Sequence, residues 1–368
     1  MRMISLLYPL LLIAPLAFAH GIAGIISSTS DLSTLNSIIN EYPEILSALA
    51  SANGTFFAPS NDALDAFISA VGGPTAVTPD AIQDLIDYHL SPLTHAAEAL
   101  STAGGALVST RLLDEAYANL EGVANVVFAS AYGSTGQDTA LGALKVYSGV
   151  GESATVTRPD LEFEGGLVHV IDRVLNFPRN CTKTAEVASL STLFEAIEKT
   201  NLTEVVDTTA KFTCFAPTNE AFAAAGIDLS ALSNDQIVDA LKYHSIVGDV
   251  GYSTAFEDGK EYQTLLGVPV TVHKRDGQLF INDVAVQQGN VIMSNGVAHV
   301  LSGVLTPPAG VTTASGASGT ETSTAPGASG TGTAGASTAG SGAIPLRAQG
   351  FSSSDIVAAL LTLYFMFA

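Results

Sequence analysis

Apolar side chains recur at helical spacing in two stretches of the chain. In residues 79–89 and again in residues 234–244, apolar positions fall three or four apart, which places them on one face of an α-helix. Both stretches begin with a helix-start signal: Thr78-Pro79 offers a cap followed by proline, and Ser233 to Gln236 forms a capping box. We therefore predict two amphipathic helices, whose stripes are Ile82, Leu85, Ile86 and His89, and Ile237, Leu241 and His244.

Short apolar runs bounded by turn residues predict β-strands. Phe56-Phe57 and Cys214-Phe215 are each followed closely by proline, which lacks the amide donor of a strand and ends the pairing. Ser60 and Thr218 then stand where a helix N-cap is expected, with an acidic residue in the following turn. Further strands are predicted over Leu167–Leu175, Val268–His273, Leu279–Val284 and Val297–Leu305, with Asp276-Gly277 as the hairpin turn between the second and the third.

Three blocks of sequence occur twice in the same order, which indicates a duplicated domain. The spacing between the copies is nearly constant for the first two blocks and shorter for the third, so the first copy carries extra residues between its second and third blocks. We expect this insertion around residues 132–141, where Gly, Ser and Thr predict an extended loop. The blocks pair Thr55–Leu64 with Thr213–Phe222, Leu85–His89 with Ala240–His244, and Gly166–Ile171 with Gly296–Leu301.

The blocks resemble those of the fasciclin-like domain family over most of residues 21–306. TFFAPSN and TCFAPTN are similar to the family's first conserved block, the Tyr-His pairs to its middle motif, and the two GxxHV segments to its second block. The resemblance implies the fold class α/β (α+β), with two tandem compact domains over residues 20–178 and 180–306. Each would be a small β-sheet wedge packed against several helices. The resemblance also implies adhesion and matrix contacts rather than an active site.

Six side chains of the repeated motifs are the candidate functional residues. In the resembling family, the region around the Tyr-His pair has been implicated in integrin contacts. A histidine on an apolar face is otherwise a buried side chain that makes one hydrogen bond through each nitrogen. We favour this structural role, with the tyrosine covering the surface beside it; an adhesion motif, a pH switch or a metal pair are the alternatives. The six are Tyr88, His89, Tyr243, His244, His169 and His299.

The charge balance limits the classes of partner. The 368 residues include 35 acidic and 14 basic side chains, a net charge of −21, which argues against nucleic acid and against a polybasic membrane helix. The apolar content of 47 % is ample for the cores of two domains. Motifs of zinc proteases, dithiol redox sites, serine hydrolases and phosphate-binding loops are missing from the sequence. We therefore predict no catalytic residue, no metal and no cofactor.

The segments before and after the two domains indicate export and a stalk. Arg2, an apolar run and Ala17-Phe18-Ala19 give residues 1–19 the pattern of a secretory signal peptide. Residues 307–343 consist mainly of Ser, Thr, Gly and Ala. This composition cannot bury enough apolar surface to offset the chain entropy, so we predict a flexible stalk.

The C-terminal end has the pattern of a glycosylphosphatidylinositol (GPI) attachment signal. Residues 356–368 are apolar and uncharged but too short to cross a bilayer, and a polar spacer and small residues precede them. We predict that residues 344–368 are removed and that Ser341 carries the lipid, with Gly350 as a weaker candidate. The alternative is an amphipathic or tail-anchor helix.

Secretion would also place the two cysteines in an oxidising compartment. Cys181 and Cys214 are then a possible disulfide. Alternatively Cys214, which replaces Phe56 of the first copy, is a buried small apolar residue. Sequons for N-glycosylation begin at Asn53, Asn180 and Asn201, and Asn201, at an expected helix end, is the least ambiguous of the three.

Together these features predict a fungal-type, GPI-anchored and non-catalytic glycoprotein at the cell surface. Its partners would be cell-wall or matrix glycans, matrix proteins or other surface proteins, with the membrane reached only through the lipid. One alternative is a secreted hydrolase or sugar-modifying enzyme, which would need two carboxylates about 5 to 10 Å apart in a cleft. Another is the same fold on the vacuolar membrane.

Overall fold

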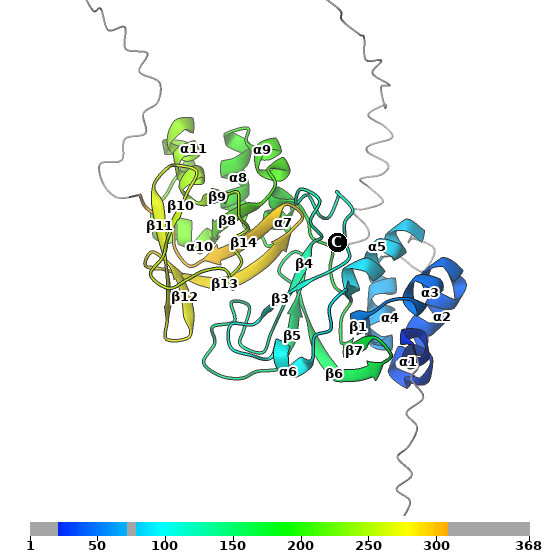
Figure 1. The fold of residues 1–368 in the computed structure, drawn as a ribbon. Helices are drawn as coiled ribbons and strands as arrows, with labels where there is room; N and C mark the ends of the chain where they lie inside the picture. Colours follow the sequence, from blue (N-terminus) through cyan, green and yellow to red (C-terminus); the bar gives the residue numbers. More distant parts are fainter. Residues whose placement is uncertain (1–20, 72–78, 308–368) are drawn as a thin grey trace, which may run out of the picture.

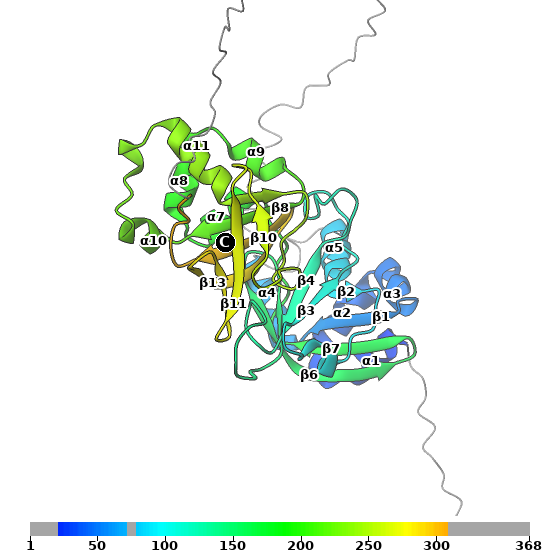
Figure 2. The ribbon, with the colours of Figure 1, turned by 60° about the vertical axis from the view of Figure 1, so that its left-hand side comes forward.

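A computed structural model describes residues 21–71 and 79–307, which form two domains of the same architecture (Figure 1). Domain 1 comprises the described residues up to 178, and domain 2 comprises residues 180–307. Each contains a seven-stranded sheet with helices packed against it. In both views helices α1 to α3 lie at the end of domain 1 that is far from domain 2 (Figures 1 and 2).

Domain 1 orders its strands β2-β1-β7-β6-β5-β4-β3. One pair, β1 and β7, is parallel, and the remaining neighbours are antiparallel. The helices are α1 Ile22–Ser28, α2 Ser33–Glu41, α3 Pro43–Ala50, α4 Asn61–Ala70, α5 Pro79–His89 and α6 Ala97–Leu100, and the short 3-10 helix η1 spans Ser30–Leu32. The strands are β1 Gly54–Pro59, β2 Leu90–Ser91, β3 Ala106–Ser109, β4 Val126–Ser130, β5 Lys145–Tyr147, β6 Ser153–Phe163 and β7 Gly166–Ile171.

Domain 2 repeats this topology in the order β10-β11-β12-β13-β14-β8-β9, again with one parallel pair, β8 and β14. The helices are α7 Cys181–Val187, α8 Ser191–Lys199, α9 Thr203–Thr208, α10 Asn219–Ala224 and α11 Asn234–Tyr243, and the 3-10 helix η3 spans Leu229–Ala231. The strands are β8 Phe212–Pro217, β9 Ser245–Val247, β10 Glu261–Gln263, β11 Pro269–Arg275, β12 Gln278–Ile281, β13 Val284–Met293 and β14 Gly296–Leu301.

Three helix starts predicted from the sequence are confirmed, whereas the predicted cap Thr78 lies outside the described residues. Ser60 caps α4 through the amide of Ala63, and Thr218 caps α10 in the same way. Ser233 and Gln236 make both bonds of a capping box at the start of α11. The glycine that opens each GxxHV block is explained by the parallel pair, because a Cβ on Gly166 would lie 1.7 Å from the carbonyl oxygen of Gly54.

Three strand predictions need correction. The predicted strands Leu167–Leu175 and Val297–Leu305 end earlier, at Ile171 and Leu301, and the amides of Leu175 and Leu305 bond to histidine side chains instead of to a neighbouring strand. The predicted strand Leu279–Val284 is also wrong. It breaks at Asn282, which has φ 52°, and the chain turns there into the long strand β13.

The extra residues of the first copy lie in two loops rather than the single one predicted. Residues 110–125 join β3 to β4, whereas only residues 264–268 join the equivalent β10 and β11. Residues 131–144 join β4 to β5, whereas the equivalent hairpin of domain 2 turns at Asp276 and Gly277. Both long loops contact domain 2.

These loops join the two domains through hydrogen bonds and apolar contacts. Asn125, at the end of the first loop, donates a hydrogen bond of 3.1 Å to the carbonyl oxygen of Met293. Ser134, in the second loop, accepts bonds from the backbone amide of Gly289 and from the side chain of Asn290. Apolar side chains from both domains form a shared cluster of Val126, Tyr252, Ile292 and Val297. The insertion is therefore the part of domain 1 that builds much of the domain interface.

Candidate functional site

Both Tyr-His pairs lie inside their domains at the end of equivalent helices. Tyr88 and His89 end α5, while Tyr243 ends α11 and His244 follows it directly. Their exposed fractions are 0 % and 2 % in domain 1 and 1 % and 5 % in domain 2. In each pair the two rings stand edge to face at an angle of 87°. None of these side chains is available at the surface for a contact with another molecule.

Each of the two helix-end histidines joins its helix to a distant strand end. The Nδ1–H group of His89 donates to the carbonyl oxygen of Leu85 at 2.7 Å, and Nε2 accepts from the amide of Leu175 at 2.9 Å. His244 makes the same two bonds to Ala240 and Leu305, at 2.8 and 2.9 Å. Both ring nitrogens are used in each case, so neither is left to bind a metal or to transfer a proton.

Burial holds these histidines in the neutral state. Desolvation lowers the pKa of His89 and of His244 to about 4, although the hydrogen bond to a helix carbonyl acts in the opposite direction. A neutral ring is also what the bond from the Leu175 or Leu305 amide requires, because a protonated ring has no acceptor nitrogen. Geometry and electrostatics therefore agree on one neutral tautomer.

The prediction for the tyrosines is wrong. Neither covers the surface, since both are fully enclosed. The hydroxyl of Tyr88 donates to the carbonyl oxygen of Val126 at 3.3 Å, and the hydroxyl of Tyr243 accepts from the side chain of Asn282 at 3.1 Å. Val126 lies in β4 and Asn282 in the turn between β12 and β13, so each tyrosine links its helix to the sheet region of its domain.

The histidines of the GxxHV blocks bind another segment of their domains than the helix-end histidines do. Nε2–H of His169 donates to the carbonyl oxygen of His95 at 2.8 Å, and Nε2–H of His299 donates to that of Gly251 at 2.7 Å. Both rings are fully buried. Desolvation lowers the pKa of His169, and it lowers the pKa of His299 to about 4. One nitrogen, Nδ1 of His299, has no hydrogen-bond partner among the described residues.

Sequence reasoning missed the residues that complete this arrangement. Asp160 and Asn290 interrupt the β6–β7 and β13–β14 ladders with left-handed backbones, at φ 54° and 51°. Their side chains accept bonds from the amides of Ala97 and Ser253, each two residues beyond the carbonyl group that the histidine of the same domain binds. A signal was present, because Asp160 and Asn290 occupy the same position relative to the two GxxHV blocks and Asp and Asn tolerate such a backbone.

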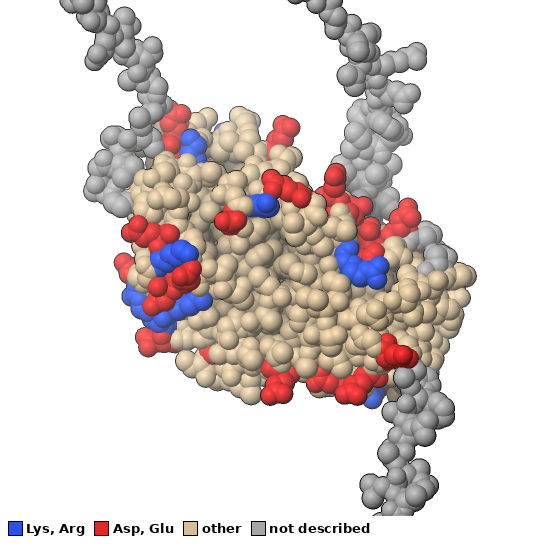
Figure 3. All heavy atoms as spheres, in the orientation of Figure 1, with Lys and Arg blue, Asp and Glu red and all other residues tan. Residues whose placement is uncertain are grey.

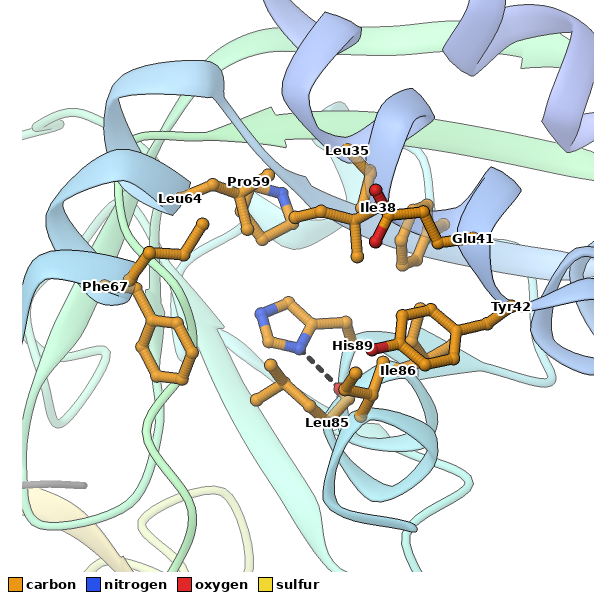
Figure 4. A pocket seen from close by; sticks show the side chains of 13 residues that line it. Leu35, Ile38, Glu41, Tyr42, Pro59, Leu64, Phe67, Leu85, Ile86 and His89 are labelled. Atoms are coloured by element: carbon orange, nitrogen blue, oxygen red, sulfur yellow. Dashed lines mark hydrogen bonds between the residues drawn. The ribbon is translucent and has the colours of Figure 1, made fainter. Parts of the chain in front are cut away.

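An apolar cavity of about 110 Å³ lies in domain 1 between α2, α4 and α5, with His89 in its wall (Figure 4). Its lining includes Leu35, Ile38, Leu64, Phe67 and Leu85. The two polar groups at its edge are Glu41 and Tyr42, both on the side opposite Phe67 in Figure 4. One carboxylate is not the pair that a glycoside hydrolase needs.

Among residues 21–71 and 79–307, no group of three or more His, Cys, Asp or Glu side chains is arranged to hold a metal ion. The same part of the chain contains no helix with the length and apolar character needed to cross a membrane.

The match to a family model agrees with the duplicated fold and the motif positions. The model of the fasciclin domain matches residues 30–178 and residues 188–307. The chain belongs to the fasciclin domain family. Each of its two fasciclin domains therefore buries the family's motif histidines in the way described above.

Fungal proteins are among the similar relatives. A fasciclin-like arabinogalactan protein of Arthroderma benhamiae is 28 % identical, over 80 % of this chain and 68 % of the relative. The fasciclin-like arabinogalactan protein elcF of Phaeosphaeria nodorum is also 28 % identical, over 80 % of this chain and 91 % of the relative. A solved FAS1 domain pair of the insect cell adhesion molecule fasciclin I aligns with 75 % of this chain and 97 % of its own, at 19 % identity and a TM-score of 0.35.

The cysteines meet in the second fasciclin domain as free thiols. Cys181 lies in the first turn of α7 and Cys214 in β8, and both are buried. Interaction with Cys214 and burial together raise the pKa of the Cys181 thiol well above its usual range. The structure thus brings the two side chains together without the bridge, and their pairing in the secreted protein stays a prediction.

The three sequons differ in how open they are. Asn53 is exposed, but the threonine of its sequon is fully buried in β1. Asn180 caps α7, and Asp207 holds the hydroxyl group of the sequon's Thr182. At Asn201 both the asparagine and its threonine are exposed. The proposed lipid site Ser341, its rival Gly350 and the signal and stalk segments lie outside the described residues.

Proposed function

We propose that this protein is a GPI-anchored glycoprotein of the fungal cell surface that acts by contact and not by catalysis. One observation carries the proposal: all four motif histidines are buried and form hydrogen bonds to the backbone within their own domain. The family's most specific residues thus build the fold, and the outer surface remains as the part that meets partners. Fasciclin domains are adhesion modules, which agrees with this assignment.

The anchor follows from the order of segments in the chain. A small-residue site, a polar spacer and a short apolar tail match a lipid-attachment signal, and the Ser/Thr-rich stalk would hold the two domains away from the membrane. Phosphatidylinositol-specific phospholipase C applied to intact cells should release the protein. Mass spectrometry should show that the polypeptide of the released form ends at Ser341. Retention on the membrane with residues 356–368 still present would contradict the anchor.

The surface favours neutral partners over polyanions. Figure 3 shows charged side chains around the margin of one face, mostly acidic but mixed with Lys and Arg at the left, and few charges over its middle. With a net charge of −21, the protein repels acidic polymers, whereas an uncharged face suits the hydroxyl groups of cell-wall glycans. Binding of the purified protein to neutral wall glucan should therefore persist when the salt concentration is raised. Loss of binding at high salt, or binding only to acidic polymers, would contradict a neutral contact.

The two alternatives have direct tests. The cavity of domain 1 contains one carboxylate and gives no support to the hydrolase hypothesis. Location on the vacuolar membrane remains the other alternative, and fluorescence microscopy of a tag inserted after Ala19 distinguishes it from the cell surface.

A further inference from the structure

Each domain ends in a segment that a motif histidine holds. After β7, the last strand of domain 1, the amide of Leu175 bonds to His89 shortly before domain 2 begins. After β14, the last strand of domain 2, the amide of Leu305 bonds to His244 shortly before the Ser/Thr-rich segment begins. Both leucine side chains are buried in the cores of their domains. The histidine therefore holds the chain at the point where it leaves each domain.

Tension along the chain acts on these two exit points. This step rests on the proposed function: a partner binds the domains, a lipid holds the C-terminal end, and a pull between them is transmitted through the residues that leave each domain. In domain 2 the pull enters just after Leu305, and the 2.9 Å bond from its amide to His244 is the last hydrogen bond before the described chain ends. The next backbone bond toward β14 joins the amide of Ser302 to the carbonyl oxygen of Ala285. The histidine bond is thus the first hydrogen bond that a pull on the C-terminal end loads.

We propose that His89 and His244 act as clamps, which keep tension on the chain from peeling β7 and β14 away from their sheets. Strand β14 lies between β13 and β8, and a pull on its C-terminal end opens its hydrogen-bonded pairs one after another from that end. The ring of His244 connects the exit segment to α11, since its Nδ1–H group is bonded to the carbonyl oxygen of Ala240 at 2.8 Å. The clamp has to open before the pairs of β14 do. It therefore slows unfolding under force, because it raises the barrier that the pull has to overcome.

Single-molecule measurements at constant force on the mature protein test the clamp of domain 2. One DNA handle is attached at Glu261 and the other at either Thr306 or Gln287, all three of which are exposed. A pull between Glu261 and Thr306 passes through Leu305, whereas a pull between Glu261 and Gln287 does not. We expect His244→Ala to shorten the lifetime of the folded domain about fivefold more in the first geometry than in the second. Equal shortening in both geometries would mean that His244 contributes only to general stability, and it would overturn the proposal.

A control variant separates the clamp from the stability of the helix before it. Ser233→Ala removes the cap at the start of α11, the helix that His244 follows, and destabilises the domain without touching the exit segment. This variant should shorten the lifetime equally in both geometries. Selective shortening by Ser233→Ala in the pull on Thr306 would also overturn the proposal.

Two further points keep the test decisive. If circular dichroism shows that His244→Ala does not fold, His244→Phe replaces it, because phenylalanine keeps a ring and has no nitrogen to accept the bond from Leu305. The measurement uses purified protein, so a failed clamp leaves the lipid anchor untouched. Retention of the protein on phospholipase-treated cells would contradict the anchor without changing the result under force.

Discussion

The Nε2 atom of His89 accepts a hydrogen bond of 2.9 Å from the backbone amide of Leu175, so a helix end and the segment after the last strand of domain 1 are joined through one ring. His244 and Leu305 form the same link in domain 2. The amides of Leu175 and Leu305 are buried and have no ladder partner, since both follow the ends of their strands. The histidine is therefore the group that satisfies them.

Replacing either histidine should destabilise its domain. His89→Ala or His244→Ala leaves a buried amide unsatisfied and opens a small cavity, at a cost of about 1 to 3 kcal/mol in the free energy of unfolding. The melting temperature of the full protein should drop by several degrees in each variant. His273→Ala, at a partly exposed histidine of β11, is the control and should melt like the parent. Parent-like melting of both variants with loss of cell attachment would instead identify an adhesion motif.

The same two residues predict an acid-sensitive fold. The pKa of His244 is about 4 in the folded protein and about 6.5 in an unfolded chain, so the unfolded state takes up the proton first as the pH falls. The stabilisation by the neutral ring is complete above pH 6.5 and is lost progressively toward pH 4, by about 3 kcal/mol in the limit. His89 follows the same course. Asp84, whose pKa is raised to about 6 by burial and by neighbouring carboxylates, opposes this trend over much of the same range.

A variant separates the histidine contribution from the others. Alanine does not titrate, so the stability gap between the parent and His244→Ala should narrow as the pH falls from 7 to 4. Urea unfolding of both proteins at several pH values measures the gap, and contributions from Asp84 cancel in the difference. A gap that stays constant over this range would show that His244 does not carry the proton linkage.

The buried tyrosines give a third test. Tyr243→Phe removes the hydroxyl group that accepts a hydrogen bond from the side-chain amide of Asn282. The same asparagine lies in the turn between β12 and β13, and its side-chain oxygen accepts a bond from the amide of Thr271 in β11. We expect a loss of about 1 kcal/mol and faster amide hydrogen exchange in that turn. Tyr88→Phe should cost less, because the bond to Val126 is longer, at 3.3 Å. Equal stability of Tyr243→Phe and the parent would mean that water replaces the lost partner.

The sequence predicted the local features of this fold better than its long-range ones. The caps at Ser60 and Thr218 depend on neighbours in the chain and were confirmed. The burial of Tyr88 and Tyr243 depends on strands far away in sequence, and the prediction of exposed tyrosines failed for that reason. Helical periodicity places a residue on a face, but it does not say that a sheet also covers the side chain at the helix end.

The placement of the insertion failed in a similar way. Composition located the loop around residues 132–141 but could not show that residues 110–125 share the extra length, since those residues contain apolar positions of their own. The apolar cavity was also invisible in the sequence. Its lining comes from α2, β1, α4 and α5, and the sequence does not show how these elements pack against one another.

The cysteine pair allows a chemical prediction. The two side chains are in contact within the core of domain 2, and secretion would expose the protein to oxidising conditions during folding. We expect the secreted protein to carry a Cys181–Cys214 bridge, so that neither cysteine is alkylated after denaturation without a reductant. In the chain-entropy account such a bridge stabilises by roughly 3 to 4 kcal/mol. Alkylation of both residues without reduction would show that they remain thiols, as in the structure.

The last prediction concerns the coupling between the domains. Asn290 donates to the carbonyl oxygen of Ser134 at 2.7 Å and so ties the 131–144 loop of domain 1 to the bulge in β13. Asn290→Gly keeps the left-handed backbone, at φ 51°, and removes this tie. The equivalent Asp160→Gly in domain 1 is the matched control, because Asp160 binds Ala97 within its own domain. Amide exchange in residues 131–144 should become faster in Asn290→Gly and stay unchanged in Asp160→Gly. Faster exchange in both variants would mean that this loop responds to general destabilisation and not to the tie between the domains.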